Sequence, residues 1–249
     1  MRVLGVDTAT STASAAIVEN GRLVAEEMFP AADPAKRDGS PHVGGNHTEI
    51  ILPLIQSVLE SAAMALADIS GLAVSIGPGS FTGLRIGLST IKGIAYGWEV
   101  PVFGFSTLLA NAMRVKDYDG LVCSFLDARK KQVYAALFRC RGDNLIRITE
   151  DSIQNADDII DLVRSFNGDN GRPCLFIGDG TTAYEKLLRD AFGDGVDLRK
   201  GDSLPSVASA VAWLGERRCC VKAPVGLETN LAPIYLRPSE AEVKQKKIS

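Results

Sequence analysis

The sequence has little of several features that mark whole classes of protein. With 27 Lys and Arg against 30 Asp and Glu among 249 residues, its net charge is only −3, so contact with nucleic acid has to come from a local patch. The five cysteines are odd in number and lack C-x-x-C spacing, which favours buried thiols in a reducing cytoplasm over a disulfide framework. No uncharged run reaches the roughly 18 residues that a membrane span needs, so no contact with a membrane is predicted.

Motifs for metal and nucleotide binding are also missing. His42 and His47 are the two histidines, and their spacing of 5, without an acidic residue between them, does not favour a metal site. The segment SIGPGSFTGLRIG, residues 75–87, is rich in glycine but matches neither common nucleotide motif. No lysine follows Gly83, as a Walker loop requires, and Thr82 stands where a dinucleotide fingerprint needs its third glycine.

The most informative pattern is a repeated order of strands. Residues 2–24 contain an apolar strand ending in an aspartate, a polar turn, a second apolar strand, an Asn-Gly turn and a third strand. Residues 120–146 repeat this order, and the two aspartates, Asp7 and Asp127, lie 120 residues apart. Helical patterns follow both copies. The sequence therefore predicts an α/β fold of two duplicated lobes, with mixed sheets flanked by helices.

The same patterns set the expected boundaries. Residues 30–45 are dense in proline, glycine and charge and are predicted to be a loop. A helix is predicted from about His47, with apolar residues at helical spacing on one face. We assign residues 1–105 to an N-terminal lobe, 106–240 to a C-terminal lobe that includes the linking helix, and 241–249 to a polar tail.

The helix after the glycine-rich segment needs an explanation for its glycines. Gly79, Gly83 and Gly87 are spaced by four, which places them on one helical face. The four glycines inside this helix are Gly83, Gly87, Gly93 and Gly97, and together they cost roughly 3–4 kcal/mol of helix propensity relative to alanine. Three explanations stay open: tight packing inside the protein, close approach of another molecule's helix, or a ligand at the N–H groups of residues 80–82. The spacing alone favours internal packing.

Five segments together resemble the TsaB family, the accessory proteins of bacterial tRNA threonylcarbamoyladenosine (t6A) biosynthesis. They are VLGVDTATSTASAAIVENG, HTEIILPLIQSVL, ISGLAVSIGPGSFTGLRIGLSTIKGIAYGWEVPVFGFSTLLANA, LDARKKQVYAALF and APIYLRP. The resemblance is most specific before residue 125. It implies two actin-like ATPase lobes (the ASKHA, ribonuclease H-like fold) of the glycoprotease-like superfamily. Residues 30–45 are longer than is usual in the family, and HTE replaces the more common HSE.

The resemblance also implies a function. Such a protein is a noncatalytic subunit that binds and activates TsaD, which transfers threonylcarbamoyl to N6 of adenosine 37 in tRNAs reading ANN codons. The implied partners are TsaD, TsaE and a second copy of the chain, with indirect or weak contact to tRNA. No cofactor is required, although weak binding of ATP or ADP is compatible with the fold. The alternative is an enzyme, either a small actin-fold phosphotransferase or a glycoprotease-like metallopeptidase.

Finally, the resemblance assigns residues to roles. A partner and dimer interface lies on the HTEIILPLI helix and the glycine-faced helix, where the glycines let a partner helix approach. It contains His47, Glu49, Leu52, Ile55, Ser80, Gly83, Leu84, Gly87 and Ile91. A degenerate nucleotide cleft contains Asp7, Thr8, Asp127, Gly178 and Gly180, with the two aspartates facing each other. No catalytic residue and no metal ligand is implied. Because Asp7 leads into TATSTAS, without a glycine turn or a lysine, capping of a turn remains the simpler role for its carboxylate.

Overall fold

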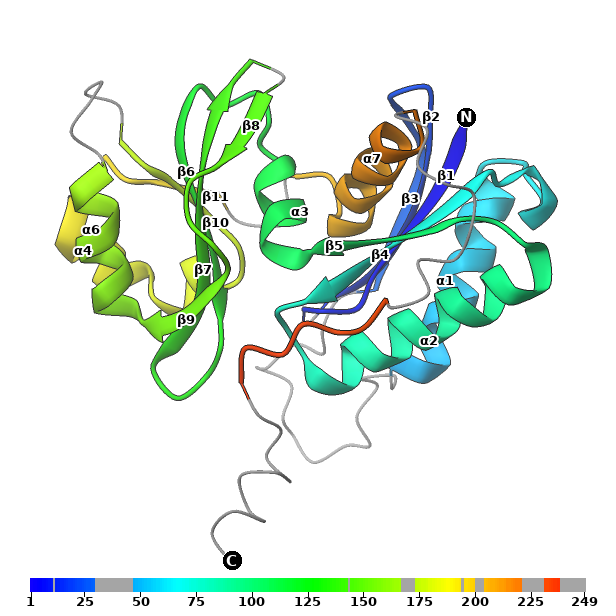
Figure 1. Cartoon of the computed structure of the whole chain (residues 1–249). Helices are drawn as coiled ribbons and strands as arrows, with labels where there is room; N and C mark the ends of the chain where they lie inside the picture. The colour runs from blue at the N-terminus through cyan, green and yellow to red at the C-terminus, as the bar shows by residue number, and fades with distance from the viewer. Residues whose placement is uncertain are drawn as a thin grey trace, which may run out of the picture. The chain divides into compact units, whose positions relative to one another are not determined.

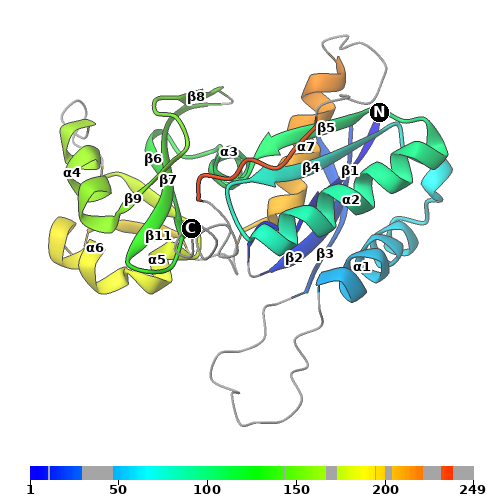
Figure 2. The same cartoon turned by 60° about the horizontal axis from the view of Figure 1, so that its bottom comes forward.

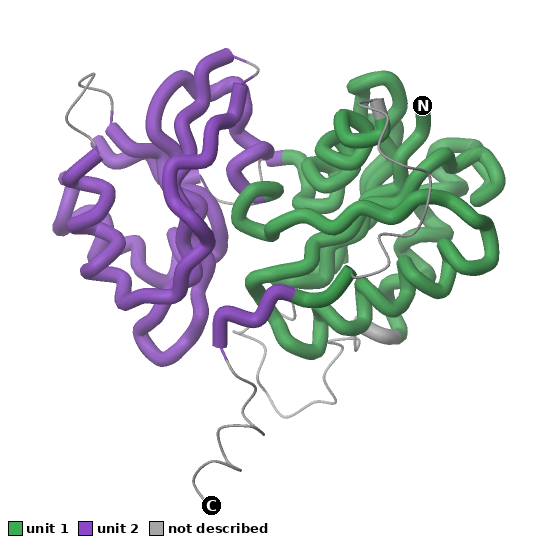
Figure 3. The backbone as a smooth tube through the Cα atoms, viewed as in Figure 1, with its two compact units in different colours: residues 1–110, 205–233 green, residues 111–204, 234–249 purple. Residues whose placement is uncertain are grey.

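The computed structural model of the chain describes residues 1–10, 12–29, 47–142, 144–166, 173–193, 195–199, 204–220 and 231–237. The chain divides into two compact units, which Figure 3 shows in different colours. Unit 1 comprises residues 1–110 and 205–233, and unit 2 comprises residues 111–204 and 234–249. The predicted loop at 30–45 and the predicted tail at 241–249 lie outside the described residues.

Unit 1 is built on a five-stranded mixed sheet with the order β3-β2-β1-β4-β5. β1 pairs antiparallel with β2 and parallel with β4. Asn20 and Gly21 form the predicted turn, with φ of 51° and 77°, the left-handed conformation that a two-residue hairpin turn requires. The strands are β1 (Arg2–Asp7), β2 (Ala13–Glu19), β3 (Arg22–Phe29), β4 (Gly71–Gly77) and β5 (Val102–Ser106).

Helices cover both faces of this sheet. α1 (His47–Ser61) and α2 (Phe81–Trp98) lie side by side on one face, and α7 (Val207–Cys220) packs on the other, against β1, β2 and β4 (Figures 1 and 2). Towards α1 and α2 the strands present a core of large apolar side chains, among them Leu4 and Ile17. Towards α7 they carry small residues, so that this helix lies close to the sheet. The short helix η2 (Leu66–Asp68) also belongs to unit 1, and α3 (Thr107–Met113) contains the residues at which the chain passes from unit 1 to unit 2.

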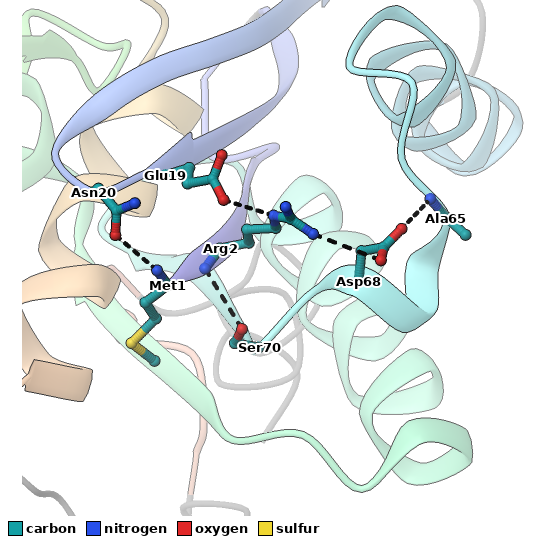
Figure 4. Close-up of polar contacts among 7 residues, drawn as sticks. All are labelled: Met1, Arg2, Glu19, Asn20, Ala65, Asp68 and Ser70. Carbon is teal, nitrogen blue, oxygen red and sulfur yellow. Dashed lines mark hydrogen bonds and ion pairs between the residues drawn. The ribbon is translucent and has the colours of Figure 1, made fainter.

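Polar contacts hold the start of β1, as Figure 4 shows. The Arg2 guanidinium lies 2.7 Å from the Glu19 carboxylate on β2 and 3.5 Å from the Asp68 carboxylate on η2. The terminal ammonium of Met1 donates to Oδ1 of Asn20 at 2.8 Å. These contacts join β1 to the β2–β3 turn and to η2, although each partly exposed ion pair contributes little stability.

A carboxylate from the edge strand β3 holds the N-terminus of α7. Glu26 accepts the N–H of Ser206 at 2.8 Å and the hydroxyl of Ser209 at 2.6 Å. The Ser206 hydroxyl oxygen accepts the N–H of Ser209 at 3.0 Å, which is the usual N-terminal capping bond. The carboxylate also lies at the positive end of the helix dipole. Glu26 therefore orders the segment by which the chain returns to unit 1.

We expect Glu26→Ala to lower the free energy of unfolding by about 2 kcal/mol, because a helix start loses the acceptor for two of its donors. Urea unfolding measures the change. Glu27→Ala, on the opposite face of the same strand, is the matched control, and we expect a change of less than about 0.5 kcal/mol. Equal stability of the two variants would contradict the capping role.

Unit 2 repeats the plan of unit 1. Its six-stranded sheet has the order β11-β10-β6-β7-β8, and β9 pairs with β7. β6 pairs antiparallel with β7 and parallel with β10, as β1 does with β2 and β4. The strands are β6 (Gly120–Asp127), β7 (Gln132–Arg141), β8 (Asn144–Arg147), β9 (Ser152–Asn155), β10 (Leu175–Ile177) and β11 (Asp197–Arg199). The helices are α4 (Ala156–Phe166), α5 (Gly180–Ala183) and α6 (Glu185–Phe192).

The predicted duplication is confirmed by this topology. In each sheet the first strand is central, ends in an aspartate and lies between the next strand, which is antiparallel to it, and a later strand, β4 or β10, which is parallel to it. The division of the chain differs from the predicted lobes, because residues 205–233 belong to unit 1 instead of the C-terminal lobe. The reason is the packing of α7 on the first sheet. In the part of the chain that the structure describes, none of the helices is long and apolar enough to cross a membrane.

Candidate functional site

The glycine-rich segment 75–87 leads from β4 into α2. Ser80 lies just before the helix, and its hydroxyl oxygen accepts the N–H of Gly83 at 3.2 Å, which caps the N-terminus. The N–H of Ser80 donates to the carbonyl oxygen of Ala9 at 2.7 Å. A Cβ at Gly79 would lie 2.3 Å from the same oxygen. The loop is thus closed against the residues that follow β1, and only glycine permits that contact at position 79.

Gly83 and Gly87 face the interior of unit 1. Thr8, which is fully buried, donates its hydroxyl to the carbonyl oxygen of Gly83 at 2.7 Å. A Cβ at Gly87 would lie 2.3 Å from that hydroxyl oxygen. Internal packing therefore requires glycine at position 87, and Gly83 is buried on the same side of α2. The structure corrects the prediction that these two glycines admit a partner helix.

Three further residues assigned to the interface are internal as well. Ile55 on α1 has 4% of its surface exposed, and Leu84 and Ile91 on α2 have none. Their regular spacing marks the apolar stripe by which each helix packs on the sheet. A side chain that is buried against the sheet is not available to a partner, so these three residues leave the predicted interface.

A different side of the two helices is exposed. Leu52 on α1 is 55% exposed and Tyr96 on α2 is 84% exposed. Gly93 and Gly97 are exposed too, and a Cβ at either position would meet no described atom within 4 Å. We call Leu52, Gln56, Gly93, Tyr96 and Gly97 the outer face; all five are exposed.

The sequence predicted that Gly93 and Gly97 lie in the helix, but not that they face away from Gly83 and Gly87. Gly93 is six residues after Gly87, which corresponds to a rotation of about 240° around a helix. This rotation could have indicated from the sequence that Gly93 lies on a different face of the helix from Gly87. Of the other residues predicted for the interface, Glu49 and Ser80 are exposed, and their place in the interface stays a prediction. The side chain of His47 is not among those that the structure describes.

In unit 2, two carboxylates meet where β6 and β10 end. Asp179 accepts the N–H of Asp127 at 2.9 Å. Asp127 accepts the N–H of Arg129 at 2.8 Å and lies 3.4 Å from the Arg129 guanidinium. Burial raises the pKa of the Asp179 carboxyl, and the N–H of Asp127 acts in the opposite direction. Both carboxylates thus hold the backbone of turns. Among the described residues, no group of three or more His, Cys, Asp or Glu side chains is placed to bind a metal ion.

Gly178 and Gly180 lie in the turn between β10 and α5. Gly178 has a φ of 123°, and Cβ atoms at the two positions would lie 2.5 and 2.7 Å from the carbonyl oxygen of Phe125. The hydroxyl of Thr181 donates to the carbonyl oxygen of Gly178 at 2.7 Å. The glycines therefore let this turn pack closely on β6.

Asp7 ends β1 in unit 1, as Asp127 ends β6 in unit 2. It is fully buried and accepts the N–H of Ala9 at 3.3 Å and the hydroxyl of Thr10 at 3.4 Å. Within each unit, the aspartate that ends the first strand therefore caps a turn. A nucleotide cleft with Asp7 opposite Asp127 stays a prediction, because the two residues belong to different units.

Comparison with known proteins agrees with this architecture. The family model of TsaD, tRNA N6-adenosine threonylcarbamoyltransferase, matches residues 41–243. The tRNA threonylcarbamoyladenosine biosynthesis protein TsaB of Escherichia coli is 30% identical over 97% of this chain and 96% of its own length. YeaZ from Pseudomonas aeruginosa superposes with a TM-score of 0.71 at 21% identity, covering 94% of this chain and 99% of YeaZ.

A more distant structure extends the likeness of fold. The ROK hexokinase of Thermus thermophilus superposes with a TM-score of 0.51 at 11% identity, over 89% of this chain and all of the hexokinase. The two duplicated lobes are therefore of the actin-like ATPase type, as predicted. The chain belongs to the TsaD-type family and, within it, to the TsaB proteins of tRNA threonylcarbamoyladenosine biosynthesis.

Proposed function

We propose that this chain is a noncatalytic subunit that binds a TsaD protein and activates it. The reaction served is the transfer of threonylcarbamoyl to N6 of adenosine 37 in tRNAs that read ANN codons. Membership of the TsaB family supports the pathway. The capping roles of Asp7 and Asp127 support a protein without catalytic residues of its own, for which neither a nucleotide nor a metal is required.

The outer face of α1 and α2 carries the proposal. A mostly apolar exposed surface with a large aromatic residue is typical of a binding interface. Next to Tyr96, the open space above Gly93 and Gly97 lets the backbone of a partner helix come close to α2. We therefore propose this face, with Glu49 beside it, as the surface that binds TsaD. It also serves a competing homodimer, and the ATPase TsaE joins the assembly in the cytoplasm.

Sedimentation velocity with the TsaD protein of the same organism tests the pairing. We expect Tyr96→Asp to weaken the complex about 30-fold or more, since an interface anchor contributes about 2 kcal/mol or more. Ile146→Asp is the matched control, because Ile146 is a large apolar residue of unit 2 that is 55% exposed. A complex undiminished by Tyr96→Asp, or lost equally with Ile146→Asp, would exclude the outer face as the binding surface.

A further inference from the structure

The turn between β6 and β7 carries three consecutive basic residues in an uncommon conformation. Arg129, Lys130 and Lys131 have φ of 62°, 54° and 63°, so all three adopt the left-handed conformation. Glycine and asparagine adopt it far more readily than long side chains. A turn made of three long basic residues therefore indicates that the side chains themselves are needed. We call residues 129–131 the basic tip.

Hydrogen bonds fix the backbone below the basic tip. The N–H of Ala128 donates to the carbonyl oxygen of Gln132, and the N–H of Gln132 donates to the carbonyl oxygen of Arg129, both at 3.0 Å. Arg237 donates to the carbonyl oxygen of Ala128 at 2.6 Å and to the side chain of Gln132. Because these hydrogen bonds already order the backbone of the turn, binding through its side chains costs little further backbone entropy.

The charge of the basic tip is directed outward. All three of its residues are exposed, and the side chain of Arg129 is 82% exposed. The Arg129 guanidinium lies 3.4 Å from the Asp127 carboxylate at the base of the turn, and both Asp127 and Asp179 accept backbone N–H groups there. Among the described residues, Arg237 adds a fourth positive charge beside the turn, and the carboxylates that bond to the turn are those of Asp127 and Asp179.

The chemistry of the basic tip fits a phosphate backbone better than a protein surface. Protein interfaces draw most of their affinity from aromatic and apolar anchors, and residues 129–131 present only charged groups. Phosphates are bound by exposed Lys and Arg through charge alone, without a pocket. Conditional on the proposed role in tRNA modification, we propose that the basic tip contacts the phosphate backbone of the tRNA substrate.

The test compares two variants that each lose three positive charges. The first is Arg129→Gln, Lys130→Gln, Lys131→Gln. The matched control is Arg141→Gln, Lys186→Gln, Arg217→Gln, which removes three exposed basic residues elsewhere. Binding of an unmodified tRNA transcript that reads an ANN codon is measured by fluorescence anisotropy over a series of salt concentrations. The measurement uses the full chain alone and the chain in complex with TsaD.

We expect the tip variant to bind tRNA about tenfold more weakly at low salt. The slope of log affinity against log salt should fall by about 2–3, because each lost phosphate contact removes about 0.7–0.9 from it. The single variant Lys131→Gln should lower the slope by about 1. Thermal melting confirms that each variant folds. We expect the control variant to keep at least most of the wild-type slope.

Three results would overturn the proposal. The first is equal tRNA affinity and slope for the tip and control variants, and the second is no tRNA binding by the wild type, alone or with TsaD. The third is a tip variant that binds tRNA normally but no longer sediments with TsaD, which would make the tip a protein-binding surface. Failure of the wild type to bind TsaD, with tip-dependent tRNA binding intact, would instead count against the proposed function.

Discussion

Threonylcarbamoyl transfer to tRNA is expected to fall to background when this chain is left out of a reaction with TsaD, TsaE, tRNA and the adenylate-forming enzyme. We expect the Gly93→Leu variant to fail to restore it. A Cβ at position 93 meets nothing within 4 Å among the described residues, and replacing a helical glycine gains about 1 kcal/mol of helix propensity. The same leucine fills the space that the partner's backbone requires. Incorporation of labelled threonine into tRNA measures transfer.

The matched control adds a leucine to an exposed helix of the other unit. Lys186 on α6 is exposed, and we expect Lys186→Leu to restore transfer fully. Alone, the purified chain should neither hydrolyse ATP nor cleave peptides above background. Full transfer without the chain would refute the role of an activating subunit. ATP hydrolysis that disappears with Asp7→Ala would favour the phosphotransferase alternative.

The Gly87→Leu variant is expected to lower the free energy of unfolding of unit 1 by about 3–4 kcal/mol, from overpacking and the loss of a buried hydrogen bond. Even a Cβ would lie 2.3 Å from the hydroxyl oxygen of Thr8, so Thr8 has to move and give up its bond to Gly83. The side chain of Thr8 is β-branched and fully buried, so it has few alternative rotamers. Urea unfolding measures the loss.

Comparison with Gly93→Leu makes this prediction specific. Both variants introduce the same side chain into α2, so their helix propensities change equally. We expect the leucine at position 87 to impair folding and the leucine at position 93 to impair partner binding. A Gly87→Leu variant that is as stable as the wild type and no longer binds TsaD would return Gly87 to the interface.

Much of the architecture was predictable because its signals are local. The Asn20–Gly21 turn, the apolar strand before Asp7 and its repeat before Asp127 are patterns within a few neighbouring residues. Turn residues and apolar periodicity act through the conformation of their own segment. Two matching copies of one strand order then implied two sheets of the same plan, which the structure confirms. The resemblance to the TsaB family was likewise carried by contiguous segments.

The direction in which each residue faces was decided by the tertiary structure. Gly87 and Gly93 look alike in the sequence, but one faces Thr8 and the other faces open space, because the position of β1 beside α2 depends on contacts distant in the chain. The same holds for α7, whose return to the first sheet requires glycine at position 5 of β1 and the carboxylate of Glu26, about 180 residues away in sequence. Helical spacing by itself determined that these glycines share a helix. Packing against the sheet determined which of them remain available to a partner.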